Sequence, residues 1–142
     1  MTKQAPEVVV DWLQGYVFLG SDESGHSVVY DAPEKGVPRG MTPMNALLAS
    51  LGACSGMDIV AVLGKRKQRV TSMRVTISGV RPEYGYPKPF TSISLNYVLT
   101  GKGLEKRFVD EAVKGSMEKY CSVAATVNAK AKIDYAYEIV EG

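Results

Sequence analysis

The chain has 142 residues and a formal net charge of +2, and 45% of its residues are hydrophobic and 23% charged. This balance is typical of one soluble globular domain spanning residues 1–142 and excludes a disordered or fibrous chain. The basic residues are scattered along the sequence, so the charge pattern favours neither a nucleic acid nor a membrane surface as a partner. The first residues lack the apolar core of a secretory signal and no lipidation motif is present, so we expect a cytoplasmic protein.

The first elements expected along the chain are strands. Residues 8–19 and 26–30 are rich in Val, Tyr and Phe, and the polar, glycine-containing segment 20–25 separates them. This pattern predicts a strand meander with a turn. Residues 31–41 are rich in Pro and Gly, which predicts a loop, and this loop carries Arg39.

A long apolar helix is expected next. Thr42 is a suitable N-cap and Pro43 a suitable first helical residue, and the helical run continues to about residue 68. Within residues 44–63 the one charged residue is Asp58, and the run is apolar nearly all round, which predicts a helix buried in its surroundings. Its length would also cross a bilayer, but its polar residues and glycines favour the core helix of a soluble protein.

A long hairpin should follow the helix. Residues 73–80 and 91–99 alternate between apolar and polar side chains, which predicts two strands. The connection 81–90 contains three prolines, and its aromatic residues, Tyr84 and Tyr86 among them, either line an apolar pocket or pack the loop on the sheet.

The remaining residues predict two helices and a last strand. Helical spacing covers residues 104–119, a second short helix covers 122–130, and strand-like alternation covers 131–140. The order of elements therefore predicts an α+β fold in which a mostly antiparallel sheet packs on the long helix.

Two cysteines carry the chemistry that the sequence offers. They cannot form the disulfide framework of a small secreted domain, and with a single histidine they do not make an ordinary zinc site, so no metal or cofactor is expected. A cysteine pair in a reducing compartment indicates either redox chemistry or two inert, buried thiols. Both interpretations are open at this point.

The surroundings of the two cysteines differ. Cys54 lies in the middle of the apolar helix, where burial and the carboxylate of Asp58 one turn away both raise a thiol pKa, so a reactive Cys54 needs a nearby cation. Arg39 is the nearest candidate in the sequence. Cys121 lies at the start of the short helix, whose positive end favours a thiolate. His26, near a turn, is interpreted as solvated or structural rather than catalytic, and the spacing leaves open whether the cysteines meet.

Two segments resemble the OsmC/Ohr family. Residues 42–60 read Thr-Pro-Met-Asn-Ala-Leu-Leu-Ala-Ser-Leu-Gly-Ala-Cys-Ser-Gly-Met-Asp-Ile-Val, and residues 118–123 read Glu-Lys-Tyr-Cys-Ser-Val. The resemblance runs from about residue 8 to the C-terminus. Within the family, the chain most resembles the YhfA-type branch, which shares the Met-Asp spacing after the cysteine and the Lys-Tyr-Cys-Ser-Val block.

The resemblance implies an intertwined homodimer in which a long helix from each subunit lies between sheets. It implies reduction of organic hydroperoxides or hydrogen peroxide, with Cys54 as the peroxidatic cysteine that becomes a sulfenic acid and Cys121 as the resolving cysteine that forms a disulfide with it. A dithiol reductant, of the lipoyl type in relatives, would complete the cycle.

Two departures from the family pattern keep an alternative open. Better-studied branches use a Glu near the start of the long helix and an Arg in the N-terminal strands, whereas this chain has Asn45 and no strand arginine, which leaves Arg39 as the substitute. Asn45 is nine residues from Cys54 and so faces the opposite side of the helix, which makes any contact between them one across the dimer. The alternative is a catalytically weak, dimeric binding protein for a small apolar ligand. A general disulfide reductase is disfavoured because no Cys-x-x-Cys pair is present.

Overall fold

The computed structural model describes residues 2–34 and 36–129. The expected last strand, residues 131–140, lies outside these residues. The chain divides into two compact units, Met1–Ala49 and Ser50–Gly142.

The first unit contains a three-stranded antiparallel sheet in the order β1 (Val8–Gln14), β2 (Val17–Asp22) and β3 (Ser27–Tyr30). The predicted meander is confirmed, but residues 8–19 form parts of two strands rather than one. Gly15 adopts a φ of 54° between β1 and β2, a left-handed conformation that glycine tolerates best, and so makes the first turn.

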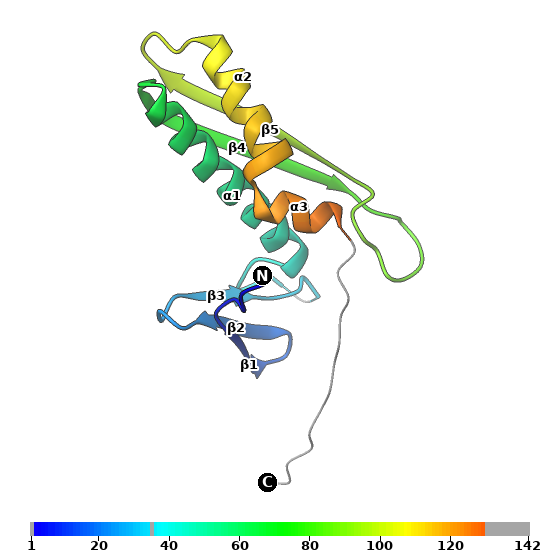
Figure 1. The fold of residues 1–142 in the computed structure, drawn as a ribbon. Helices are drawn as coiled ribbons and strands as arrows, with labels where there is room; N and C mark the ends of the chain where they lie inside the picture. Colours follow the sequence, from blue (N-terminus) through cyan, green and yellow to red (C-terminus); the bar gives the residue numbers. More distant parts are fainter. Residues whose placement is uncertain (1, 35, 130–142) are drawn as a thin grey trace. The chain divides into compact units, whose positions relative to one another are not determined.

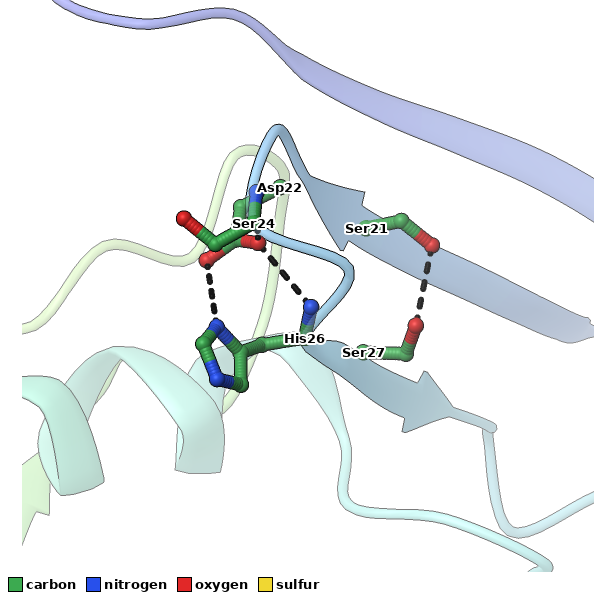
Figure 2. Close-up of polar contacts among 5 residues, drawn as sticks. All are labelled: Ser21, Asp22, Ser24, His26 and Ser27. Carbon is green, nitrogen blue, oxygen red and sulfur yellow. Dashed lines mark hydrogen bonds and ion pairs between the residues drawn. The ribbon is translucent and has the colours of Figure 1, made fainter.

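Hydrogen bonds to one carboxylate close the turn between β2 and β3 (Figure 2). Asp22 Oδ1 accepts from the backbone N–H groups of Ser24 at 2.9 Å and His26 at 3.0 Å, and His26 Nδ1 lies 3.3 Å from Asp22 Oδ2. The N–H of His26 is the largest cause that lowers the pKa of Asp22. The His26 side chain is 82% exposed, which agrees with the structural interpretation of this residue.

Helix α1 spans Pro43–Lys65 and begins where the sequence predicts. Thr42 Oγ1 accepts a hydrogen bond from the N–H of Asn45 at 3.3 Å, so Thr42 caps the helix. The helix ends three residues before the expected position. Lys67 has a φ of 55°, and a residue in the left-handed region just beyond a helix stops its continuation.

In the second unit, α1 packs on a long antiparallel hairpin formed by β4 (Val70–Val80) and β5 (Ser92–Gly101) (Figure 1). Alternate residues of both strands are half-buried and apolar, and the residues between them are exposed, as the sequence predicts. The half-buried side chains that face the helices include Met73, Tyr97 and Leu99.

Three helical segments follow the hairpin in the described residues. Helix α2 (Lys106–Gly115) lies on the same face of the hairpin as α1, a π-helical turn (Ser116–Tyr120) follows, and α3 (Ser122–Asn128) comes last (Figure 1). The two short helices are confirmed, but the sequence pattern gave no indication of the π-helical turn. The described residues show a mixed fold of helices and antiparallel sheet.

The hairpin and α2 cover one face of α1. Every fourth residue from Leu51 to Leu63 is buried, and Ile59 and Leu63 are wholly inaccessible and pack with Ala112 of α2. Among the described residues nothing covers Met57, which is 71% exposed, so the prediction of a helix buried on all sides is wrong for this chain taken alone. By length and composition α1 could also cross a membrane, but core helices of soluble proteins meet the same criterion.

Candidate active site

The second unit brings both cysteines together with one carboxylate. The Sγ atoms of Cys54 and Cys121 and a carboxylate oxygen of Asp58 all lie within 4.8 Å of one another. Both cysteines are free thiols. Cys121 belongs to a buried cluster with Leu51 and Ala124, against which Cys54 packs. The contact that sequence spacing leaves open is therefore made within one chain.

The π-helical turn after α2 positions Cys121. The N–H of Cys121 donates to the carbonyl of Ser116 at 2.8 Å, five residues back, which adds one residue to the turn. Cys121 then adopts an extended conformation with a φ of −72° and a ψ of 107°, and α3 begins at the next residue. As the N-cap of α3, Cys121 accepts a hydrogen bond at Sγ from the N–H of Ala124 at 3.3 Å.

Burial raises the pKa of the Cys121 thiol. The residue is 4% exposed, and this desolvation is the largest cause that raises the pKa of its thiol, with the Cys54 side chain acting in the same direction. The N–H groups at the start of α3 oppose the rise without cancelling it. The sequence correctly placed Cys121 at a helix start, but the inference of a favoured thiolate is wrong because burial outweighs the helix end.

Asp58 is held by a buried hydroxyl. Ser116 Oγ donates to Asp58 Oδ2 at 2.9 Å and lies 3.4 Å from the carbonyl oxygen of Ser55. Within the described residues this side-chain hydrogen bond of Asp58 comes from Ser116. The carboxylate is thus fixed close to the two thiols.

A second pair of hydroxyls joins the hairpin to α1 beside this cluster. The O–H of Tyr97 donates to Ser55 Oγ at 2.7 Å, and Ser55 Oγ donates to the carbonyl of Gly52 at 3.2 Å. Burial is the largest cause that raises the pKa of Tyr97, the charges of Cys121 and Asp58 add to it, and the hydrogen bond with Ser55 opposes it. Tyr97 therefore stays a neutral phenol at neutral pH.

Sequence reasoning missed the hydroxyl residues of this site. The alternation along residues 91–99 does place Tyr97 on the apolar face of its strand, and that signal was available. Ser55 and Ser116 offered no comparable signal, because a serine in a helix has the same local pattern whether or not it is buried.

A cleft opens beside Asp58. Its volume is about 570 Å³, and its walls come from α1, the residue after it, α2 and the π-helical turn: Asp58, Ala61, Val62, Lys65, Arg66, Glu111 and Tyr120. Arg66 and Glu111 form a two-point ion pair across it, with distances of 3.0 and 2.7 Å. The carboxylate of Asp58 is therefore within reach of small solutes.

Arg39 and Asn45 belong to the first unit, whereas both cysteines belong to the second. The backbone N–H of Arg39 donates to Asp31 Oδ2 at 2.8 Å, and this bond is the largest cause that lowers the pKa of Asp31. The roles of Arg39 and Asn45 stay predictions.

Tyr84 and Tyr86 are 82% and 92% exposed and do not line the cleft beside Asp58.

The chain matches a known protein family. The family model for OsmC-like proteins matches residues 34–136. Protein YhfA of Escherichia coli K12 is 37% identical over 131 residues, which cover 92% of this chain and 96% of that protein.

Solved structures agree with this match. A hypothetical protein from Aquifex aeolicus VF5 is 34% identical with a TM-score of 0.77, and the likeness covers 88% of each chain. An organic hydroperoxide resistance protein, OsmC, from Legionella pneumophila has a TM-score of 0.60 over 89% of this chain and 92% of that chain. Its identity of 17% shows a shared fold and nothing finer.

Proposed function

Because this chain belongs to the OsmC-like family, we propose that it is a thiol peroxidase that reduces organic hydroperoxides or hydrogen peroxide through Cys54 and Cys121. The observation that carries the proposal is the approach of the two sulfur atoms to within 4.8 Å in one chain. The presence of an organic hydroperoxide resistance protein among proteins of this fold supports the same chemistry.

Cys54 is the cysteine that attacks the peroxide. Its side chain is half-buried, whereas Cys121 is 4% exposed and has a raised thiol pKa, so Cys54 is the better placed of the two to meet a substrate. The sulfur of Cys54 bonds to the outer peroxide oxygen, the O–O bond breaks, and the departing alkoxide takes a proton to become an alcohol. Cys54 is left as a sulfenic acid.

Cys121 then resolves the sulfenic acid. Its thiol loses a proton, the sulfur attacks Sγ of Cys54, and the S–O bond breaks as the hydroxyl takes up a proton and leaves as water, which gives a Cys54–Cys121 disulfide. A disulfide bond is about 2.05 Å long, so the sulfur atoms must approach by less than about 3 Å, a movement within the range of side-chain rotation. A dithiol of the lipoyl type returns the protein to its reduced state by disulfide exchange.

A homodimer completes this proposal. Met57 and Val60 on α1 are 71% and 53% exposed, and uncovered apolar side chains of this size mark a surface for association. In the dimer, Arg39 supplies the cation that favours the Cys54 thiolate, and Asn45 supplies a hydrogen bond. We propose that the dimer works in the cytoplasm, where a dithiol reductant is available.

The intact mass of the protein tests the cycle directly. Fully reduced protein is treated with about one equivalent of cumene hydroperoxide, in parallel with Cys54→Ser and Cys121→Ser. The unsubstituted protein should lose two hydrogens, Cys121→Ser should gain one oxygen, and Cys54→Ser should not change. An unchanged mass of the unsubstituted protein over minutes would contradict the cycle and favour the catalytically weak binding protein.

A further inference from the structure

We propose that the reduced protein binds one soft divalent cation of the zinc class, with Cys54, Asp58 and Cys121 as its ligands. Their three ligand atoms lie within 4.8 Å of one another. The inference goes beyond peroxide reduction and does not depend on it, because cation binding requires only the reduced thiols and the carboxylate.

The distances suit a tetrahedral ion. Zinc bonds sulfur at about 2.3 Å and carboxylate oxygen at about 2.0–2.2 Å, so two sulfur ligands of a tetrahedral ion lie about 3.8 Å apart. Separations of at most 4.8 Å therefore need to shorten by only about 1 Å, which rotation of the side chains supplies. The backbone can stay where it is.

The fold positions the three ligands close together. Cys54 and Asp58 are four residues apart on α1 and so share one helix face, the spacing by which a helix presents two metal ligands together. The N–H of Ala124 fixes the sulfur of Cys121 at 3.3 Å. Ser116 donates to Oδ2 of Asp58, and such outer hydrogen bonds orient carboxylate ligands in metal sites.

The chemistry of the set selects the kind of cation. Two thiolates favour zinc and other soft ions over magnesium and calcium, which require oxygen ligands. The fourth position is open to water or a small solute, because Asp58 lines the cleft and Cys54 is half-buried. Binding breaks two S–H bonds, releases both protons to solvent and forms two metal–sulfur bonds, so it needs no oxidant or reductant.

Bound cation and disulfide exclude each other, because each uses both sulfur atoms. If the proposed peroxidase cycle operates, the cation protects the reduced thiols from peroxide, and oxidation releases the cation. This consequence alone rests on the proposed function.

Cobalt(II) is the probe for the site. Reduced, metal-free full-length protein is titrated with cobalt under argon, and one equivalent should produce thiolate-to-cobalt charge-transfer absorption together with the visible bands of a tetrahedral ion. Zinc should displace the cobalt and remove both signals. Cys54→Ser and Cys121→Ser should each lose at least half of the charge-transfer intensity, since each keeps one sulfur.

Asp58→Asn is the decisive variant, because it keeps the shape of the side chain and both thiols. Zinc affinity, measured by competition with a chromophoric chelator, should fall at least tenfold in Asp58→Asn and about tenfold in Ser116→Ala. Asp110→Asn is the matched control, since Asp110 is an exposed carboxylate on α2 paired with Lys106, and it should bind zinc as the unsubstituted protein does.

Two results would overturn the proposal: no thiolate–cobalt absorption in the reduced protein, or equal zinc affinities for Asp58→Asn and Asp110→Asn. Circular dichroism confirms that each variant is folded before it is titrated. Since no peroxide is present, failure of the cation site leaves the mass test of the peroxidase untouched, and failure of that test leaves the cobalt result standing.

Discussion

The two units of this chain use similar apolar sequence in different ways. All seven residues of β1 in the first unit are exposed, with Val8 at 68% and Trp12 at 66%. In the second unit Ile59, Leu63 and Ala112 are fully buried between α1, α2 and the hairpin. An apolar strand or helix face is buried only when another element covers it. The second unit therefore has a core of its own together with both cysteines, whereas none of the described residues covers β1.

A charge on the uncovered face of α1 tests whether that surface belongs to a dimer. Met57→Lys should raise the dissociation constant of the proposed homodimer at least a hundredfold, because an unpaired charge buried at an interface costs about 3–5 kcal/mol. Sedimentation velocity over a range of concentrations measures the change.

Thr76→Lys, on the exposed outer face of β4, is the control and should leave the dimer intact. A monomeric unsubstituted protein, or equal dissociation constants for the two variants, would show that a second copy of the chain does not cover this face of α1.

Truncation of one apolar residue in each unit compares their cores. Ile59→Ala should lower the free energy of unfolding by about 2–5 kcal/mol, because it leaves a cavity in a fully buried site. Val10→Ala removes a side chain that is 58% exposed and should change that free energy by about 0.5 kcal/mol or less in the monomer. Urea titration at a concentration where the protein is monomeric gives both values. An equal cost for the two substitutions would mean that the first sheet is covered without a partner.

The sequence predicted the elements whose signals are local. The cap at Thr42 and the alternation of the two hairpin strands depend on neighbouring residues, and the structure has both. The turn at Gly15 was missed because apolar residues continue on both sides of it. The π-helical turn was missed because its bond from Cys121 back to Ser116 has no periodic signature in the sequence.

The sequence identified the two cysteines of the site, but it did not predict the distance between them, their hydrogen-bond partners or their burial. The family resemblance indicated Cys54 and Cys121, but only the fold gives the distance between residues so far apart in the sequence. The same limit applies to Ser116 as the partner of Asp58, and to the raised pKa of Cys121, since burial is a property of the packed chain.

Arg39 tests whether the first unit contributes to the chemistry of the second. Arg39→Met should lower kcat/KM for cumene hydroperoxide about tenfold to a hundredfold, because a hydrogen bond to a charged group contributes about 1.5–3 kcal/mol. Arg81→Met is the matched control, as the Arg81 guanidinium binds the carbonyl of Lys88 in the exposed hairpin loop, and it should stay within about twofold of the unsubstituted protein. If both variants keep full activity, the cation that favours the Cys54 thiolate comes from elsewhere.

The smallest expected effect is the pH dependence of Cys121, and it decides the order in which the cysteines act. In Cys54→Ser the remaining thiol should titrate above its ordinary range, because burial, the largest cause of its raised pKa, is unchanged. A pKa raised by folding stabilises the protein below the unfolded-state value, and this contribution is lost as the pH rises through the folded-state value. The free energy of unfolding of Cys54→Ser should therefore decline with alkaline pH more steeply than that of a Cys54→Ser, Cys121→Ser double variant, in urea titrations across that range. A thiol that titrates at or below its ordinary range would make Cys121 the more reactive cysteine and exchange the proposed roles of the two residues.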